Sequence, residues 1–559
     1  MEIKVAIIQQ KAGNVEHSIK TLQSSLALID QAVREKPDLV VLPECIFPGY
    51  LLGMLNLKKL MANGWPELEM SLISFCSKAR QHEIYLIVGA PEMTKEGIFN
   101  SAYLIDPAGK IVGTARKSCL WHFDSQWFSS GSDYPVFETT IGKIGMIVCA
   151  DGRQPEISRI LALKGAQLIV DVTNLVSAGA TAAQLSNPQA EYILPCRAAE
   201  NRVWYIVANK VGIEAESIVY CGKSCIISPD GEKLVTASSD QEEIIYGELA
   251  VSLSDNKQFA QDFNVERARN PHLYKIISSA ETKGFPVLEV LSEKLTPNQL
   301  SFNVGVAQWR AEMSLAVFLV KLYQVVPIMS LQYSRMLVFP ELACLYEDGA
   351  EERILPAAAE LAREYGVALV LGTTRRKEAQ KIKAGCLTLP SGEQYFSDKC
   401  HLTDWELRQG FSGGTSQPVF ETPFGRVGIM MGYEGLVPEV ARCLMLQGAD
   451  LICWINNYTA DYVRLFSRTR ASENKVYLLV SNVWREKSEE INKEPKGDTL
   501  IVNPSGNILA TALANTDQVI SAQLELAQSR CKTIVTGTDV VQSRIPQAYS
   551  LLSTTLANQ

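Results

Sequence analysis

The chain alternates short apolar, β-branched runs with longer stretches in which apolar residues recur every three or four positions. Residues 17–36 follow the second pattern, which is typical of a helix with one apolar face. The predicted stripe on that face comprises Ile19, Leu22, Leu26, Ile29 and Val33. The short runs predict strands, partly or wholly buried, at 4–9, 39–44, 84–90, 101–106, 143–149, 166–172, 204–209 and 223–229.

Two short polar segments separate neighbouring strand candidates. The sequences DPAG at 106–109 and SPDG at 228–231 contain the residues that favour tight turns, and they predict hairpins. Strands that alternate with amphipathic helices predict a layered α/β fold in which helices cover the sheet faces. The pattern by itself leaves the topology open.

The pattern of the first half recurs in the second half, in the same order. Matched pairs are VVLPE at 40 with LVFPE at 337, PVFETTIGKIG at 135 with PVFETPFGRVG at 418, RAAEN at 197 with RASEN at 470, and RNPHLY at 269 with RIPQAY at 544. A period of about 280 residues is too long for a solenoid and indicates a duplicated domain. We predict domains at 1–280 and 301–559, joined by a linker at 281–300.

Composition and charge narrow the classes of partner. The 559 residues are 47% hydrophobic and carry a net charge of −8, which argues against nucleic acid or an anionic membrane as the main partner. The N-terminal segment does not resemble a signal peptide, and no apolar run reaches 18 residues, so we expect a cytoplasmic protein. Thirteen scattered cysteines and five unclustered histidines predict free thiols, no metal site and no cofactor.

Three residues in the first half combine chemical reactivity with a position at the end of an apolar run. Glu44 follows VVLP, Lys117 follows VGTAR, and Cys149 follows GMIV. In α/β sheets, the ends of strands are common places for functional residues. A thiol can attack a carbonyl or nitrile carbon, a carboxylate can move the proton, and an ammonium can stabilise an oxyanion. The three residue types together therefore indicate acyl-transfer chemistry that needs no histidine.

The segments around these residues resemble the nitrilase superfamily, also called carbon–nitrogen hydrolases. The matching motifs are VVLPECIFPGY at 40, ARKSCL at 115, GKIGMIVCADGRQPE at 142 and RAAEN at 197. The resemblance covers nearly all of both halves and implies a four-layer αββα sandwich in each. It also implies that Glu44 is the general base, that Cys149 is the nucleophile, and that Lys117 and the Ala150 N–H bind the oxyanion.

Further site residues are implied less directly. Asp124 matches an acid that many relatives carry after the lysine, although Glu is the usual residue. Arg153 stands where N-carbamoyl amino-acid hydrolases of this family use an arginine to bind the substrate carboxylate. An ion pair between Arg153 and a neighbouring acid such as Glu156 is the alternative. Tyr50, in FPGY, is a second candidate for lining the substrate pocket.

The second half retains part of this set. Glu341, Lys399 and Glu406 hold the matching positions, but Gly432 stands where the thiol should be. Glycine has no side chain that could attack, so we predict that the second domain forms no acyl-enzyme. We interpret it as a non-catalytic partner in an internal pseudo-dimer, with further self-association left open. The interval 44–89 is also longer than its counterpart 341–372, which favours a substrate-shaping loop in the first domain.

The predicted function is hydrolysis of a small non-peptide amide or N-carbamoyl bond through an acyl-enzyme on Cys149. A nitrile-hydrolysing enzyme and a non-catalytic binding or scaffold protein are the alternatives. The segment GFSGG at 410–414 fits a serine-hydrolase pattern, but no strong strand precedes it and no suitable histidine follows. The expected partner is a small-molecule amide, N-carbamoyl compound or nitrile.

Overall fold

The computed structural model describes residues 1–260, 262–280, 285–378, 380–457, 462–485 and 497–555. The chain forms two compact units. Unit 1 comprises Met1–Phe259 and Thr533–Leu551, and unit 2 comprises Ala260–Lys532 and Leu552–Gln559. Each repeat therefore builds most of one unit.

The C-terminal segments of the two repeats are exchanged between the units. Residues 260–280, which the repeat boundaries assign to the first domain, belong to unit 2, and residues 533–551 belong to unit 1. In unit 2, Arg269 donates to the Leu552 carbonyl at 2.7 Å. In unit 1, the ring of Tyr549 stacks on Tyr134, with ring centroids 6.4 Å apart. The buried contacts of each segment thus place it in the unit built by the other repeat. Self-comparison of the sequence does not reveal these contacts.

Two six-stranded sheets form the centre of unit 1. The first has the order β15-β1-β2-β3-β4-β5, and the second has the order β14-β13-β10-β8-β7-β6. Strands β1, β2 and β3 are parallel, as are β7, β8 and β10. The strands are β1 (Glu2–Gln9), β2 (Leu39–Val41), β3 (Tyr85–Met93), β4 (Ile98–Ile105), β5 (Ile111–Arg116), β15 (Glu243–Ala250), β6 (Val136–Thr139), β7 (Gly142–Val148), β8 (Leu168–Val172), β10 (Trp204–Ala208), β13 (Cys225–Ile227) and β14 (Lys233–Thr236).

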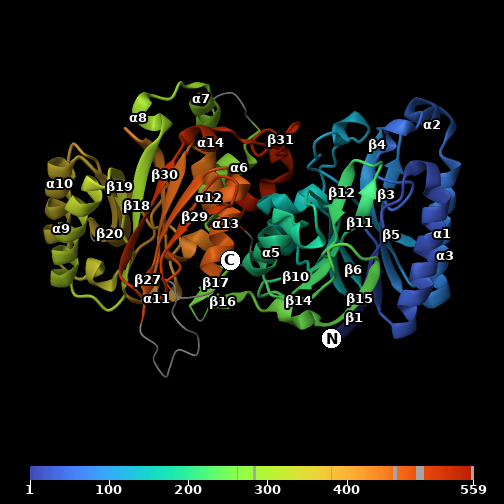
Figure 1. Ribbon diagram of the computed structural model, residues 1–559. Coiled ribbons are helices and arrows are strands. Elements are labelled where there is room, and N and C mark those ends of the chain that lie inside the picture. The colour runs from blue at the N-terminus through green and yellow to red at the C-terminus, as the bar shows by residue number, and fades with distance from the viewer. Residues whose placement is uncertain (261, 281–284, 379, 458–461, 486–496, 556–559) are drawn as a thin grey trace. The chain divides into compact units, whose positions relative to one another are not determined.

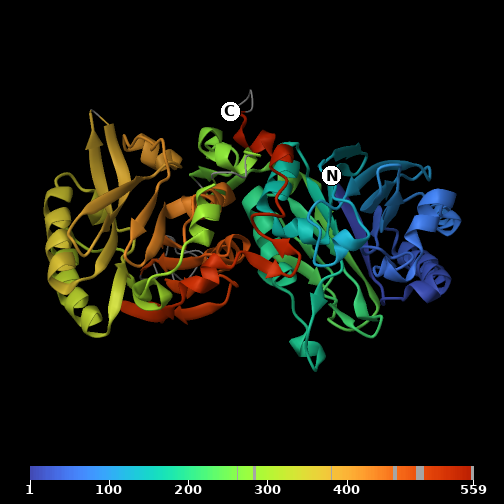
Figure 2. The ribbon, with the colours of Figure 1, turned by 90° about the horizontal axis from the view of Figure 1, so that it is seen from above.

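Helices cover the outer faces of both sheets in unit 1 (Figure 1; Figure 2). Helices α1 (Ser18–Ala32) and α3 (Pro66–His82) pack on the first sheet, and α4 (Pro155–Leu163) and α5 (Leu194–Asn201) pack on the second. Apolar side chains from both sheets fill the space between them; they include Val5, Ile7, Val41, Ile87, Ile144, Met146, Val170 and Ile206. The αββα sandwich implied by the resemblance is confirmed.

Unit 2 repeats this architecture. Its sheets have the orders β22-β21-β20-β19-β18-β27, with β30 also paired to β18, and β23-β24-β25-β26-β28-β29. Its principal helices are α9 (Leu315–Leu331), α10 (Glu351–Tyr365), α12 (Pro438–Leu446) and α13 (Tyr462–Asn474). The strands are β18 (Phe302–Arg310), β19 (Ser334–Val338), β20 (Ala368–Lys377), β21 (Gln380–Thr388), β22 (Gln394–Asp398), β23 (Val419–Thr422), β24 (Gly425–Met431), β25 (Leu451–Ile455), β26 (Tyr477–Ser481), β27 (Val483–Trp484), β28 (Leu500–Val502), β29 (Ile508–Thr511) and β30 (Gln518–Leu524).

The local predictions agree with these elements, with one exception on a helix. All eight predicted strand regions contain strands, and both predicted turns join hairpin strands, β4 to β5 and β13 to β14. The helix predicted at 17–36 is α1 with a short 3-10 turn after it. Ile19 was expected on the buried stripe but is 50% exposed, because the buried face runs through Leu22, Ser25 and Ile29.

The thirteen cysteines are all described, and none forms a disulfide. Within the described part of the chain, no helix is both long enough and apolar enough to cross a bilayer. Nor do three or more potential ligand side chains from His, Cys, Asp and Glu gather as a metal-binding group among the described residues.

Candidate active site

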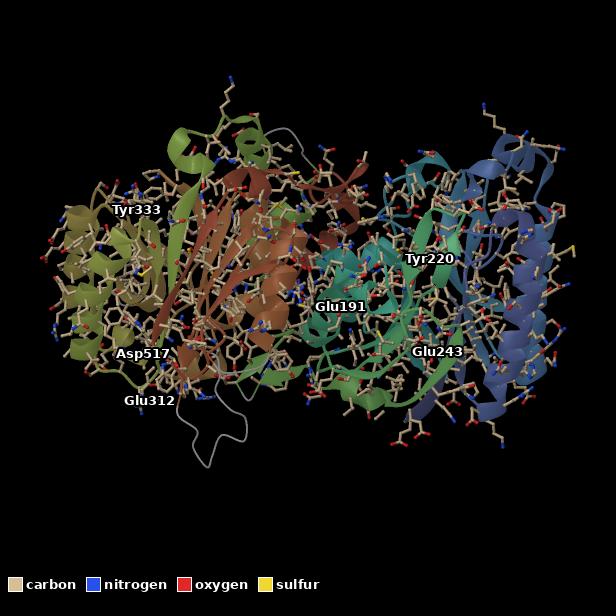
Figure 3. All side chains as sticks on the ribbon, viewed as in Figure 1. Glu191, Tyr220, Glu243, Glu312, Tyr333 and Asp517 are labelled. Carbon is tan, nitrogen blue, oxygen red and sulfur yellow. The ribbon has the colours of Figure 1, made fainter. Side chains whose placement is uncertain are left out.

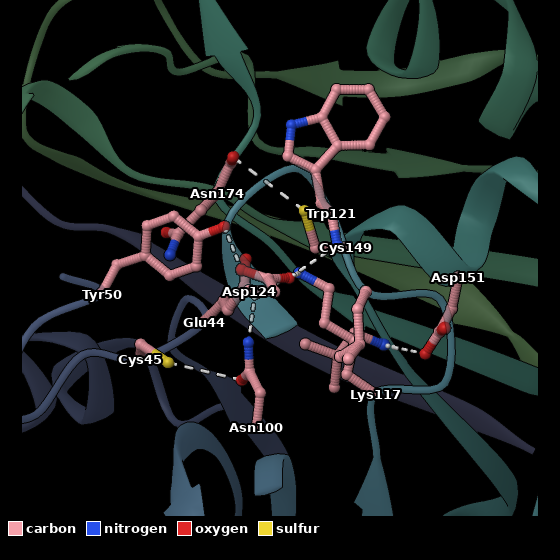
Figure 4. A network of polar contacts seen from close by, with 12 residues as sticks. Glu44, Cys45, Tyr50, Asn100, Lys117, Trp121, Asp124, Cys149, Asp151 and Asn174 are labelled. Atoms are coloured by element: carbon pink, nitrogen blue, oxygen red, sulfur yellow. Dashed lines mark hydrogen bonds and ion pairs between the residues drawn. The ribbon is translucent and has the colours of Figure 1, made fainter. Parts of the chain in front are cut away.

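The carboxylate of Glu44 lies in a buried network just beyond the end of β2 (Figure 4). Its Oε1 accepts hydrogen bonds from Asn100 Nδ2 at 2.6 Å and from Lys117 Nζ at 2.9 Å. Gly89 on β3 permits this placement, because a Cβ at position 89 would lie 2.5 Å from the Glu44 Cα. Among the described residues, Oε2 of Glu44 has no hydrogen-bond partner. One oxygen is therefore held in place while the other can accept a proton.

Lys117 follows β5 directly and is fully buried. Its Nζ lies 2.9 Å from Glu44 Oε1 and 2.8 Å from Asp124 Oδ2. Burial acts to lower the pKa of Lys117, but the negative charges around it, that of Asp124 first, raise this pKa well above its ordinary value. Lys117 is therefore a permanent ammonium group whose position is set by two carboxylates.

Asp124 connects Lys117 to two other groups. It accepts hydrogen bonds from the Tyr50 hydroxyl at 2.5 Å and from the Trp121 backbone N–H at 2.9 Å. The shorter side chain of Asp thus still reaches the lysine. Tyr50 is buried with its hydroxyl bonded to Asp124, and it does not line the pocket at Cys149.

A second buried carboxylate holds the backbone that carries Tyr50. Glu214 Oε1 accepts hydrogen bonds from the N–H groups of Tyr50 and Leu51 at 2.6 and 3.0 Å. Its Oε2 accepts from the hydroxyl of Tyr220, which Figure 3 labels, at 2.9 Å. The FPGY segment is therefore fixed by hydrogen bonds as well as by packing.

Cys149 immediately follows β7 and begins a 3-10 turn, Cys149–Arg153. Its φ of +53° lies in the left-handed region, which is unfavourable for a residue with a Cβ. Two hydrogen bonds stabilise this conformation: the Cys149 N–H donates to Asp171 Oδ1 at 2.8 Å, and the Cys149 carbonyl accepts from Gln189 Nε2 at 2.5 Å. The turn places Sγ 3.9 Å from the Asn174 carbonyl oxygen, the contact drawn in Figure 4, where the charges of Glu44 and Lys117 act on the thiol.

The thiol of Cys149 is held in its neutral form. Burial raises its pKa above the ordinary value, and the charge of Glu44 raises it further, while Lys117 acts in the opposite direction. At neutral pH a nucleophilic thiolate would therefore form only when a base removes the proton.

A small, narrow pocket lies beside the sulfur. Its lining comprises Trp121, Cys149, Ala150, Arg153, Asn174, Leu175, Val176, Asn187 and Gln189. The Arg153 guanidinium lies over the Trp121 ring, 4.8 Å from the centroid, and Nη2 is 3.5 Å from Asn187 Oδ1. Among the described residues, Arg153 forms no ion pair with a carboxylate, Glu156 included. Its charge is available to a ligand in the pocket.

The RAAEN motif supports the turn that carries the thiol. Arg197 donates to the carbonyls of Gly152 and Arg153 at 3.2 and 2.9 Å and pairs with Glu200 at 2.7 Å. Arg470 does the same in unit 2, where it donates to the Gly435 carbonyl at 3.0 Å and to the Leu436 carbonyl at 3.1 Å. The motif is therefore structural in both repeats.

Sequence reasoning missed several polar residues of this site, among them Asn100, Asp171 and Gln189. Asp171 carried a usable signal, because it is a charged residue inside the apolar run LIVDV. Asn100 and Gln189 carried none, since their roles depend on contacts with Glu44 and Cys149, which are distant in the sequence.

Unit 2 preserves the backbone of the site but not its chemistry. Gly432 has φ +51°, close to the value at Cys149, and a Cβ there would lie 3.0 Å from both Glu341 Oε2 and Lys399 Nζ. Lys399 pairs with Glu406 at 2.6 Å. Trp454 holds the strand position of Asp171, and its Nε1 donates to the Gly432 carbonyl at 2.8 Å.

A lysine also replaces the asparagine that bonds the first glutamate. Lys383 donates to Glu341 Oε1 at 3.1 Å, as Asn100 does to Glu44. The match is supported by the backbone, since the Lys399 N–H donates to the Lys383 carbonyl as the Lys117 N–H does to Asn100. The GFSGG segment at 410–414 follows the short helix α11 (Asp404–Arg408), so it is not the strand-to-helix turn of a serine nucleophile.

Comparison with known proteins gives consistent matches in both halves. The profile of the family described as carbon-nitrogen hydrolase matches residues 4–257 and 303–531. The chain is 32% identical to "Nitrilase" of Pyrococcus abyssi (strain GE5 / Orsay) over 273 residues, which cover 49% of this chain and 99% of that protein. It is 28% identical to "Omega-amidase NIT3" of Saccharomyces cerevisiae, covering 50% of this chain and 97% of that protein.

Among solved structures, the chain is similar to a carbon-nitrogen hydrolase from Helicobacter pylori G27. The match covers 45% of this chain and 91% of that protein, with 26% identity and a TM-score of 0.40. The family profile covers most of the chain in two consecutive matches, in agreement with the repeat in the sequence and the paired sandwiches in the structure. The chain therefore belongs to the carbon–nitrogen hydrolases of the nitrilase superfamily, as a tandem duplication of the family's domain.

Proposed function

We propose that unit 1 hydrolyses a small amide or N-carbamoyl compound through a thioester on Cys149. The observation that carries the proposal is that Glu44, Lys117 and Cys149, from the ends of three strands, meet in one buried network with a pocket beside the sulfur. Hydrolysis of carbon–nitrogen bonds is the chemistry of the family to which the chain belongs.

The first half of the proposed reaction forms the acyl-enzyme. Glu44 accepts the thiol proton on its unpartnered Oε2, and the sulfur attacks the substrate carbonyl carbon. The oxyanion that develops is stabilised by the Lys117 ammonium and the Ala150 N–H. Glu44 then returns the proton to the leaving nitrogen, the carbon–nitrogen bond breaks, and ammonia or an amine departs.

The second half releases the acid. Glu44 takes a proton from a water molecule, the resulting hydroxide attacks the thioester carbon, and the same two donors stabilise the oxyanion. The carbon–sulfur bond breaks and the thiolate recovers the proton from Glu44. Asp124, held by Tyr50, acts as a positioning residue for Lys117 in both halves.

Arg153 is the proposed determinant for substrates with a carboxylate. It lines the pocket near Cys149, has no carboxylate partner among the described residues, and is kept in place by Trp121. A guanidinium can bind a carboxylate through two parallel hydrogen bonds. An ω-amide or an N-carbamoyl amino acid therefore fits better than a neutral amide.

Unit 2 is proposed to be non-hydrolytic, because Gly432 offers no nucleophile. Its role in this proposal is that of an internal pseudo-dimer partner for unit 1. If this is right, the full-length Cys149→Ala variant has no turnover on any substrate that the wild type cleaves.

Two measurements test the proposal. Iodoacetamide should label Cys149 stoichiometrically with loss of activity, and Glu44→Gln should slow labelling at neutral pH and lower kcat by about 10²- to 10⁴-fold. Turnover is then measured on amides, N-carbamoyl amino acids and nitriles, with Cys149→Ala as the blank. Ammonia with carbon dioxide indicates N-carbamoyl cleavage, and ammonia alone indicates an amide or a nitrile. No turnover on any compound, with labelling unaffected by Glu44→Gln, would support a binding or scaffold protein instead.

A further inference from the structure

One face of helix α9 in unit 2 is apolar and exposed to solvent. The inner face of this helix packs into the core of unit 2 through buried side chains, namely Leu315, Phe318, Leu322, Val326 and Met329. The outer face carries apolar side chains that are 41–81% exposed, namely Val317, Val320, Tyr323, Ile328 and Leu331. A surface helix normally presents polar side chains to water, and exposed apolar patches mark interaction sites. The outer face of α9 therefore points to a binding partner.

The exposed residues of α9 are arranged symmetrically about Gln324. Val320 and Ile328 lie four residues before and after it. Val317 and Leu331 lie seven residues before and after it. Spacings of three and four residues place these side chains on one line along the helix. We call these five residues the α9 stripe.

This symmetry makes the α9 stripe complementary to a second copy of itself. In a dimer with two-fold symmetry, the same patch is used twice, so that residue i contacts residue j and j contacts i. If two α9 helices pack antiparallel with Gln324 on the axis, Val317 faces Leu331 of the other copy. Val320 then faces Ile328 of the other copy. Gln324 faces itself, and one amide can both donate to and accept from a second amide.

The polar groups beside the stripe already have partners within unit 2. Lys321 pairs with Asp517, and the Tyr323 hydroxyl donates to Glu360 at 2.9 Å. The neighbouring helix α10, which lies beside α9 in Figure 1, contains four glutamates and two arginines. Lysine and arginine, rather than glutamate, flank apolar helix faces that bind anionic membranes. The surroundings of the stripe therefore favour a protein partner over a membrane.

The matching helix of unit 1 has a polar outer face. When VVLPE at 40 is aligned with LVFPE at 337, α1 matches α9, and the buried Ile29 falls on the buried Val326. The positions of the α9 stripe are held in α1 by exposed residues, namely Lys20, Gln23, Ala27, Gln31 and Arg34. The fold of the repeat therefore does not require an apolar outer face, and this face is particular to unit 2.

The apolar area of this face is sufficient for a weak dimer. A fully exposed aliphatic side chain presents about 60–120 Å² and an aromatic one about 150–250 Å². Multiplied by the exposed fractions of the five apolar residues, these values give about 300 Å² per copy. Since interfaces are about 60% apolar, the contact would bury about 500 Å² on each copy and about 1,000 Å² in all. That total meets the lower limit for a specific interface.

We propose that two copies of the chain associate through α9 of unit 2, with the two helices antiparallel about a two-fold axis at Gln324. The α9 stripe of each copy forms the centre of the contact. This inference is independent of the hydrolysis proposed for unit 1.

The first test is sedimentation velocity of the full-length protein from about 1 to about 100 µM. The expected result is a reversible dimer with a Kd below about 100 µM. Val320→Lys places an ammonium group opposite an isoleucine and should raise Kd by about 100-fold or more. Gln23→Lys is the matched control, because Gln23 holds the position on α1 that Val320 holds on α9; it should leave Kd unchanged.

The second test examines the antiparallel register. Val320→Lys and Ile328→Glu should each weaken the dimer when alone. An equimolar mixture of the two variants should associate again, because the introduced ammonium then faces the introduced carboxylate and the second layer of the pair stays apolar. A mixture of Val320→Lys with Val320→Glu should not associate, since position 320 faces position 328 rather than itself.

Four results would overturn the proposal: a monomer at every concentration up to about 100 µM; a dimer that Val320→Lys and Gln23→Lys affect equally; association of the mixture with Val320→Glu but not of that with Ile328→Glu; or a monomer that co-sediments with phosphatidylcholine vesicles through the stripe. Thermal midpoints confirm that each variant is folded. None of these results bears on the proposed chemistry at Cys149.

Discussion

Replacing Asp124 by Asn tests how the buried lysine is held. The side chain keeps its size and loses only its charge. Asp124 accepts three hydrogen bonds, from Lys117 at 2.8 Å, the Tyr50 hydroxyl at 2.5 Å and the Trp121 N–H at 2.9 Å. An amide can accept from Lys117 and Trp121 with its oxygen and donate to Tyr50 with its nitrogen, so the variant should still fold.

The expected loss of stability follows from these three bonds. A hydrogen bond to a charged group contributes about 1 kcal/mol more than one to a neutral group, so neutralising Asp124 should cost about 3 kcal/mol. For a domain of this size the loss lowers Tm by about 6–12 °C. The raised pKa of Lys117 means that its contribution is complete below its ordinary pKa and is lost only at more alkaline pH. The loss should therefore be the same at pH 7 and pH 8.

Activity should fall because the ammonium is no longer held from both sides. Glu44 remains as a partner for Lys117, so the lysine stays charged but is less well placed for the oxyanion. We expect kcat to fall by about 10- to 100-fold with little change in KM. Thermal denaturation followed by circular dichroism and steady-state turnover measure the two effects.

Asp133→Asn is the matched control for this variant. Its carboxylate is 83% exposed and lies 3.7 Å from Lys164, so neutralising it should leave Tm and kcat nearly unchanged. If Asp124→Asn behaves like Asp133→Asn in both measurements, Asp124 does not position Lys117, and Glu44 alone must hold the ammonium.

Three further predictions concern the turn and its surroundings. Gly432→Cys in a Cys149→Ala background should be alkylated by iodoacetamide but show no turnover, because Lys383 and Trp454 stand where unit 1 has Asn100 and Asp171. Mass spectrometry measures the alkylation and ammonia release measures the turnover; restored turnover would contradict the prediction. Burial raises the pKa of Asp151 from 3.8 to about 6, so the folded protein favours the protonated carboxyl. The stabilisation by this proton is lost as the pH rises from about 4 to about 6. The wild type should lose about 2 kcal/mol of its free energy of unfolding relative to Asp151→Asn between pH 4 and 6. A difference that stays constant over this range in denaturant unfolding would refute it. Arg197→Lys should lower the free energy of unfolding by about 2–3 kcal/mol and reduce kcat, because one ammonium cannot replace a guanidinium that bonds two carbonyls and a carboxylate. Arg470→Lys should lower stability without changing kcat.

The sequence-based predictions were accurate for features that depend on residues close together in the chain. Strands such as 143–149 and turns such as 106–109 follow from neighbouring residues, and the structure has them where they were expected. The predicted burial of Ile19 was wrong because helical spacing defines an apolar stripe but does not fix which side of the helix the sheet covers. Cys149 and Glu44 could be selected because each carries reactive chemistry at the end of an apolar run.

The supporting residues could not be selected in this way. Asn100 bonds a glutamate 56 positions away, and Gln189 bonds a carbonyl 40 positions away. Asparagine and glutamine are common in loops and strands, so residue type alone does not distinguish them. Lys383 illustrates the same limit, because only the shared backbone register shows that it holds the place of Asn100.

The sequence by itself determined the duplication, the main strands of the first repeat, the motif that identifies the family, and the missing sulfur at position 432. These features depend on local periodicity and on the identity of residues at matched positions. The tertiary structure alone decided the exchange of the C-terminal segments and the contacts of Lys117 with both Glu44 and Asp124. These features arise from packing between residues far apart in the chain, where burial and the satisfaction of hydrogen bonds, rather than local pattern, set the free energy.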